Sequence, residues 1–189
     1  MLKLKYYSMM TCMALGLLAG PVMAEDESST YGWVEKVTIE PSWGPEVKAK
    51  LDTGALTSSM QAEDIEEFQK DGEDWVRFEV EVEDEARGEV VSKTFEREIK
   101  RNLILSGAGG EDRRPAVLMT ICLGGEYYEE QFSLRDRDGL IYPVLLGRRA
   151  IQDLGPVDVT RTFTQDADCG EDAPVHSYED KEYDEDIGV

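Results

Sequence analysis

The chain has 189 residues, a length that allows one globular domain with terminal extensions and excludes a large multidomain assembly. Acidic residues number 41 and basic residues 20, so the formal net charge is −21. This charge would repel phosphate backbones and argues against nucleic-acid binding. A single histidine argues against a His-rich metal site.

Residues 1–24 predict a secretory signal peptide. Lys3 and Lys5 precede a mostly apolar stretch that carries almost no charge, and small or apolar residues follow at 22–24. The alternative is an uncleaved anchor, which is disfavoured because the apolar stretch is shorter than the roughly 20 residues of a membrane span. We therefore expect cleavage after Ala24 and a periplasmic or secreted protein with no membrane attachment after signal cleavage.

Residues 31–163 are expected to form the folded domain, and residues 164–189 an acidic tail. The tail holds ten acidic residues and one lysine, so it has little apolar area to offset the entropy cost of ordering. We predict that it is disordered. An oxidising compartment would permit a disulfide between Cys122 and Cys169, but Cys122 lies in an apolar run, and a buried free thiol is the favoured alternative.

The folded part predicts β structure. Residues 75–83 alternate apolar and charged side chains, which is typical of a half-buried strand, and a turn at 84–88 leads into a returning strand at 89–99. Gly124 and Gly125 join two further strands, 115–123 and 127–134, in a second hairpin. Other short strands are expected at 33–39, 47–51, 141–146 and 157–163. Short helices are expected at 62–70 and 148–154. Many short strands with frequent turns predict an all-β barrel or sandwich.

A carboxylate stands at the end of one predicted strand. Residues 47–51 run into Asp52-Thr53-Gly54-Ala55, and the glycine of this turn lets another backbone approach closely. The triplet alone is weak evidence, because a turn in which Asp caps its own backbone has the same sequence. A second segment adds to it, because the apolar residues 142–146 lead into Gly147-Arg148 and a predicted short helix.

This order of elements resembles that of retropepsins, the single-domain aspartic proteases of retroviruses. The stretches 48–55, 75–78 and 145–148 are similar to those of the bacterial retropepsin-like aspartic endopeptidases, whose members are often named ATP-dependent zinc proteases. The similarity covers about residues 31–163. It implies a small closed barrel of the acid-protease type with one or two short helices.

The resemblance also implies a mechanism. A retropepsin contributes one Asp per chain, so Asp52 of two subunits would meet across the two-fold axis of a homodimer. The two carboxyl groups would share one proton and activate a water that attacks a carbonyl of a peptide or protein substrate. The other matched residues would support this site: Thr53, Gly54, Ala55, Leu146, Gly147 and Arg148.

The chain departs from the family pattern beside Asp52. Family members usually carry Arg after Asp-Thr-Gly-Ala and a His a few residues on, where this chain has Leu56 and Gln61. Retroviral enzymes often place an acid after the Ala, paired with the Arg of the Gly-Arg motif. Because Leu56 has no charge, the sequence leaves the partner of Arg148 open. Two turns could be the flap that covers the site, 83–88 and 106–110, and an ordinary loop is an equal alternative for each.

The sequence contains no binding motif for the zinc and the ATP that appear in the family name. The sequence has neither His-Glu-x-x-His nor Gly-x-x-x-x-Gly-Lys-Ser/Thr, so we expect no metal and no cofactor. The acidic clusters at 63–67 and 136–139 lack the spacing of calcium loops.

The favoured interpretation is a homodimeric aspartic endopeptidase. The alternative is a catalytically inactive retropepsin-fold periplasmic binding module for a peptide or protein partner, and a third is an acidic protein that buffers cations.

Overall fold

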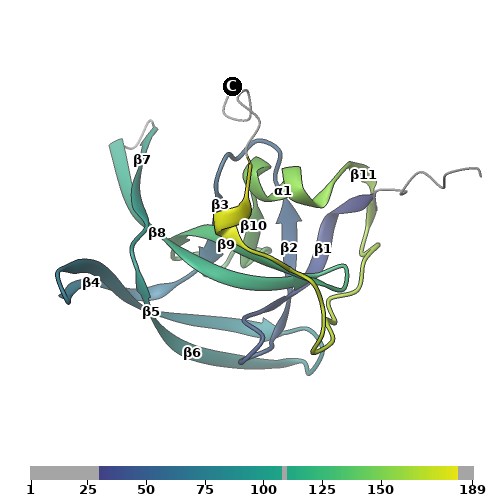
Figure 1. The fold of residues 1–189 in the computed structure, drawn as a ribbon, viewed down its shortest axis with the longest axis horizontal. Coiled ribbons are helices and arrows are strands. Elements are labelled where there is room, and N and C mark those ends of the chain that lie inside the picture. Colours follow the sequence, from purple (N-terminus) through teal and green to yellow (C-terminus); the bar gives the residue numbers. More distant parts are fainter. Residues whose placement is uncertain (1–29, 108–109, 183–189) are drawn as a thin grey trace, which may run out of the picture.

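The computed structural model describes residues 30–107 and 110–182, and its strands form two sheets around one hydrophobic core (Figure 1). The predicted signal peptide lies outside the described residues. The larger sheet has the strand order β11-β1-β2-β10-β3-β9-β8-β7, with β12 paired to β9, and the smaller has the order β4-β5-β6. The elements of the larger sheet are β1 (Tyr31–Ile39), β2 (Glu46–Leu51), β3 (Ser58–Gln61), β7 (Arg101–Gly107), β8 (Gly110–Leu123), β9 (Glu126–Arg135), β10 (Val144–Leu146), β11 (Val157–Thr162) and β12 (Val175–His176). Those of the smaller sheet are β4 (Glu63–Lys70), β5 (Glu73–Asp84) and β6 (Glu89–Glu98).

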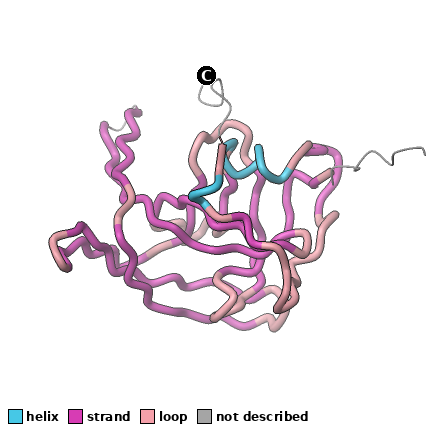
Figure 2. Tube along the Cα trace, viewed as in Figure 1, coloured by secondary structure: helices cyan, strands magenta, loops and turns pink. Residues whose placement is uncertain are grey.

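The prediction of an all-β fold is confirmed, since helices are confined to α1 (Arg148–Leu154) and the 3-10 turn η1 (Tyr178–Asp180) among the described residues (Figure 2). The arrangement is ring-like and not a strictly closed barrel. Strand β1 also pairs with β8, which closes the larger sheet into a ring, whereas β4, β5 and β6 form a separate sheet whose strands pair only with one another in the described chain. No helix of the described chain has the length and apolarity needed to cross a membrane.

The alternating pattern of β5 places one face of the smaller sheet in the core. Val76, Phe78 and Val80 are fully buried, and Phe78 stacks on Phe95 of β6 with ring centroids 5.7 Å apart. The predicted hairpin β5–β6 is therefore confirmed, as is the hairpin β8–β9, in which Gly124 and Gly125 both have positive φ.

The helix predicted at residues 62–70 is wrong. Residues 63–70 form β4, an antiparallel partner of β5. The two strands are joined by Asp71 and Gly72, whose φ angles of 55° and 90° give the turn that suits a two-residue hairpin loop. This Asp-Gly pair fixes the hairpin, and it outweighs the helix propensity of the Glu-rich stretch before it. The helix predicted at 148–154 is confirmed.

The predicted disordered tail is wrong for residues 164–182, which lie against the domain. Cys169 forms a disulfide with Cys122, so the free thiol favoured from the sequence is also wrong. Strand β12 pairs in parallel with β9 and carries the disulfide-linked segment along the domain. Packing, a covalent link and backbone hydrogen bonds together supply the stabilisation that the composition of this segment does not indicate. Residues 183–189 lie outside the described residues.

Candidate active site

Asp52 follows directly on β2 in the middle of the larger sheet (Figure 1). Strand β10 lies parallel to β2, with Leu146 opposite Leu51, and the Asp52 N–H donates to the Leu146 carbonyl at 2.7 Å. The two segments singled out in the sequence therefore end side by side. Leu51 and Leu146 are buried, and they anchor the strand ends from which the Asp52 and Gly147 turns emerge.

The Asp52 carboxylate is partly exposed and has two contacts. Its Oδ1 accepts a hydrogen bond from the Gly54 N–H at 3.1 Å, and its Oδ2 accepts one from Lys50 Nζ at 3.2 Å. The side chain is 25% exposed, and Thr53 and Gly54 next to it are exposed. The turn thus holds the carboxylate in a fixed orientation while leaving it accessible. A carboxylate presented in this way can accept or release a proton and can bind a water.

Gly147 lies where the two turns meet most closely. Its N–H donates to the buried Ser58 Oγ at 3.1 Å. A Cβ at this position would lie 2.7 Å from the Thr57 carbonyl carbon and 2.8 Å from the Leu56 oxygen, so a larger side chain does not fit. Glycine is needed here for the close approach of two backbones and not for its backbone angles, because φ is −84° and ψ is 175°.

Arg148 bonds to the backbone of the Asp52 turn. Its Nη1 donates to the Thr53 carbonyl at 2.9 Å, and its N–H donates to the Ala55 carbonyl at 2.8 Å. Carbonyl oxygens of the turn thus accept from Arg148 in this chain, which has Leu56 at the position where an acid could stand. The seven residues matched to the retropepsin motifs therefore come together at one place.

A pocket of about 530 Å³ opens beside the Asp52 turn and has a strongly basic lining. Residues 54–57 form one side of it, and Leu145 and residues 101–105 of β7 contribute other parts. No Asp or Glu of the described chain is among its lining residues. Four arginines also line it: Arg101, Arg114, Arg135 and Arg137. In a chain of net charge −21, this concentration of positive charge next to Asp52 predicts affinity for anions.

The arginines of the pocket are held by neighbouring polar groups. Arg101 donates to Gln131 and, at 2.7 Å, to Thr57 Oγ1, which ties β7 to the Asp52 turn. Arg137 is buried, and its Nε donates to the Tyr142 carbonyl at 3.0 Å. Burial lowers the pKa of Arg137, and the like charges of Arg135 and Arg114 lower it further. An anion in the pocket would offset this repulsion.

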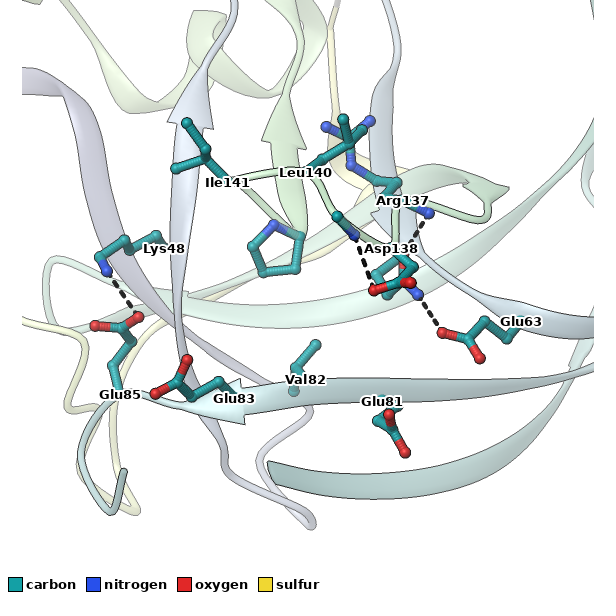
Figure 3. Close-up of a pocket in the computed structure, with 13 residues that line it drawn as sticks. Lys48, Glu63, Glu81, Val82, Glu83, Glu85, Arg137, Asp138, Leu140 and Ile141 are labelled. Atoms are coloured by element: carbon teal, nitrogen blue, oxygen red, sulfur yellow. Dashed lines mark hydrogen bonds and ion pairs between the residues drawn. The ribbon is translucent and has the colours of Figure 1, made fainter. Parts of the chain in front are cut away.

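A second pocket, of about 270 Å³, has the opposite charge (Figure 3). Glu63, Glu81 and Glu83 line it, together with Arg137, which also lines the basic pocket. Partial burial raises the pKa of Glu63, and the neighbouring carboxylates of Asp136 and Glu81 raise it further. Within the described ranges, no group of three or more His, Cys, Asp or Glu side chains is arranged to hold a metal ion.

Of the two hairpins considered as a flap, only β7–β8 contributes described residues to the pocket beside the Asp52 turn. The turn after β5 lies at the other end of β2, where the Glu85 N–H donates to the Glu46 carbonyl at 2.8 Å, about 20 Å along the strand from Asp52. Hairpin β7–β8, by contrast, lines the basic pocket through residues 101–105 and Arg114.

Sequence reasoning missed the basic pocket. Its arginines come from β7, β8, β9 and the loop after β9, and only the pairing of these strands brings them together. The available signal was weak: the arginines of an acidic chain gather in a few stretches, among them 97–114 and 135–149.

Comparisons with known proteins agree with this geometry. A crystal structure of a protein of unknown function from Legionella pneumophila superposes with a TM-score of 0.59 and 36% identity, covering 72% of this chain and 97% of that one. Two proteins named probable alpha-L-glutamate ligase match over 119 residues: that of Shewanella pealeana is 34% identical and that of Shewanella halifaxensis 35%. In both cases the match covers 63% of this chain and 26% of the relative, so it spans about a quarter of the length of these relatives.

The family model for the retropepsin-like aspartic endopeptidase RimB matches residues 30–168, which include both strand-end motifs and nearly every strand of the domain. The chain therefore belongs to the RimB-like family of retropepsin-like aspartic endopeptidases.

Proposed function

We propose that the protein is a homodimeric aspartic endopeptidase that uses Asp52 of each subunit. The observation that carries this proposal is the position of Asp52, which is partly exposed on a turn fixed by Gly54, Gly147 and Arg148. Two such turns related by a two-fold axis would bring two carboxyl groups together. One would take a proton from the attacking water, and the protonated partner would stabilise the developing oxyanion.

The basic pocket supports a preference for acidic peptides. A peptide bound across the Asp52 turn would place neighbouring side chains near the four arginines, where glutamate or aspartate would form charge-assisted hydrogen bonds. The relatives named glutamate ligases are consistent with glutamate-containing substrates. Because this chain matches only about a quarter of their length, their ligase activity is not assigned to it.

Cleavage of two matched peptides tests the proposal. We expect the mature protein to cleave a glutamate-rich peptide at mildly acid pH and to spare a lysine-rich peptide of the same length. Asp52→Asn should abolish cleavage, because the amide can neither accept the proton from water nor share one. Sedimentation should show a dimer. A monomer with unchanged cleavage in Asp52→Asn would rule the proposal out.

The second candidate is an inactive binding module in which the basic pocket holds an acidic peptide or protein partner. Calorimetry with the same peptides separates the two functions. A binding module would bind the glutamate-rich peptide with equal affinity before and after Asp52→Asn and would cleave it in neither case. Both proposed functions include export to the periplasm. N-terminal sequencing of the protein from a periplasmic extract would test this.

A further inference from the structure

Residues 164–182, which we call the C-terminal brace, run along the domain and are tied to it at several points. Glu35 of β1 accepts backbone hydrogen bonds from the first two residues of the brace. The Cys122–Cys169 disulfide links the brace to β8, and β12 pairs with β9. The family model ends at residue 168, so most of the brace lies beyond the part of the chain that it matches.

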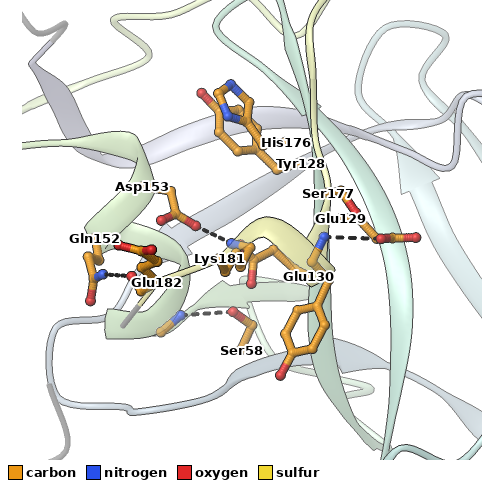
Figure 4. A network of polar contacts seen from close by, with 12 residues as sticks. Ser58, Tyr128, Glu129, Glu130, Gln152, Asp153, His176, Ser177, Lys181 and Glu182 are labelled. Atoms are coloured by element: carbon orange, nitrogen blue, oxygen red, sulfur yellow. Dashed lines mark hydrogen bonds and ion pairs between the residues drawn. The ribbon is translucent and has the colours of Figure 1, made fainter. Parts of the chain in front are cut away.

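The brace ends in a buried lysine. Nζ of Lys181 contacts the carboxylates of Glu130 on β9 and Asp153 on α1 (Figure 4). The side chains of Lys181 and Glu130 are each 3% exposed, and that of Asp153 is 20% exposed. Gln152 of α1 also donates to the Glu182 carbonyl at 2.5 Å. The end of the brace thus connects α1 to β9 through contacts that are largely shielded from water.

Helix α1 depends on such outside contacts for its position. It has seven residues, and a helix of this length is marginal in isolation. Its N-cap residue Gly147 makes no side-chain cap, and the helix has no acid in its first turn and no base in its last. Lys181 supplies a cation beside the last turn, where the sequence of the helix itself has none. Burial of Ala150 and Leu154 holds the helix to the domain as well.

The same helix holds the Asp52 turn. Arg148 Nη1 donates to the Thr53 carbonyl, the Arg148 N–H to the Ala55 carbonyl, and the Arg149 N–H to the Leu56 carbonyl at 3.2 Å. These bonds link the first turn of α1 to the residues that follow Asp52. A shift of α1 would therefore displace the turn that orients the candidate catalytic carboxylate.

We propose that Lys181, held in place by the disulfide-linked brace, is a positioning residue that fixes α1 and through it the Asp52 turn. The catalytic part of this inference rests on the proposed function. The structural part stands on the contacts from Lys181 to Asp153 and from Arg148 to Thr53. Because no brace residue lines the basic pocket, Lys181 would act on the rate of the bound complex and not on substrate binding.

Hydrogen exchange on the full-length mature protein tests the structural part. Lys181→Met leaves the buried Glu130 without its cation and could destabilise the whole fold, so Asp153→Asn is the cleaner variant because it keeps the Lys181–Glu130 pair. In Asp153→Asn we expect exchange at the amides of Asp52 and Arg148 to rise by about tenfold while the β5–β6 hairpin stays unchanged.

Kinetics with the glutamate-rich peptide provide the second readout. We expect kcat of Asp153→Asn to fall by about tenfold or more while KM is unchanged, since misplacing a catalytic group slows the reaction without weakening binding. Lys36→Met is the matched control, because it removes a partly exposed ion pair with Glu46 far from α1 and should alter neither quantity.

Three outcomes would overturn the positioning role. Exchange at Asp52 and Arg148 that does not change in Asp153→Asn would show that the brace does not hold the turn. Exchange that rises equally in the β5–β6 hairpin would show only a general loss of stability. In an active enzyme, a rise in KM with constant kcat would place the effect in binding. If the wild-type protein cleaves nothing, the proposed function fails, and the exchange pattern alone decides whether Lys181 positions the turn.

Discussion

Replacing Gly147 by alanine is the sharpest test of how the two motifs fit together. The added Cβ would stand 2.7 Å from the Thr57 carbonyl carbon and 2.8 Å from the Leu56 oxygen. Both are backbone atoms, so no side chain can rotate away, and either Gly147 with the start of α1 or the segment 56–57 after Asp52 must move. Overpacking of this kind costs about 1–3 kcal/mol. With a urea m-value of about 2 kcal/mol/M, the unfolding midpoint should fall by about 1 M.

Gly170→Ala is the matched control for this substitution. Gly170 is exposed, has no positive φ, and has no heavy atom within 4 Å of an added Cβ. The alanine should therefore stabilise the protein by about 0.4–1 kcal/mol, because it reduces the entropy of the unfolded chain. Urea unfolding followed by circular dichroism measures both variants. A midpoint of Gly147→Ala equal to that of the wild type would refute the reasoning, and cleavage by that variant at the wild-type rate would show that the Asp52 turn tolerates the displacement.

Three further predictions concern the attachment of the brace. Glu35 is fully buried and accepts four hydrogen bonds. In Glu35→Gln the amide nitrogen would face a donor, so urea titrations should show a free energy of unfolding that is lower by about 1–3 kcal/mol. An unchanged free energy of unfolding would contradict this prediction. The Cys122–Cys169 disulfide has a sequence separation of 47, so replacing both cysteines by alanine should cost up to about 4 kcal/mol, and an unaltered unfolding midpoint would exclude this role. A hydrogen bond from His176 lowers the pKa of Glu126 in the folded protein. This contact therefore stabilises the fold above about pH 4.3, the pKa of glutamate in the unfolded chain. Its contribution is lost as the pH falls through the lower pKa that Glu126 has in the folded protein. Carbon-13 NMR should show that the pKa of Glu126 rises toward its ordinary value in His176→Ala; the same titration midpoint in both proteins would contradict the assignment.

The hairpins were predictable from the alternation of apolar and charged side chains along a strand and from the residues of the turns. Residues 75–83 show which face of β5 is buried, and Gly124-Gly125 marks the turn between β8 and β9. The site motifs were also readable, because Asp52 and Gly147 each follow an apolar strand. Their contact was not readable from periodicity, since the parallel pairing of β2 with β10 joins segments about 95 residues apart. Only the resemblance to retropepsins indicated it.

Errors arose where distant contacts outweigh local composition. The segment 164–182 reads as disordered because it is acidic and poor in apolar residues, yet Glu35, Cys122 and Glu130 hold it from outside. A helix was predicted for residues 62–70 because glutamates favour helices, yet the turn at 71–72 pairs residues 63–70 with β5. The basic pocket collects arginines from four separate segments. In each case the deciding partner is far along the chain or belongs to a turn.

The pairing of β1 with β11 has a consequence for folding during synthesis. Tyr31 lies opposite Val157 in a parallel ladder, so the first part of β1 gains its outer neighbour only after β11 has been made. Until then only the end of this edge of β1 that pairs with β8 is covered, and an emerging chain cannot complete its sheet. Loop closure over this separation is slow compared with hairpin formation, and an open edge can pair with other chains. Chains truncated before residue 157 should therefore aggregate, and a holding chaperone would serve the nascent protein best at this edge.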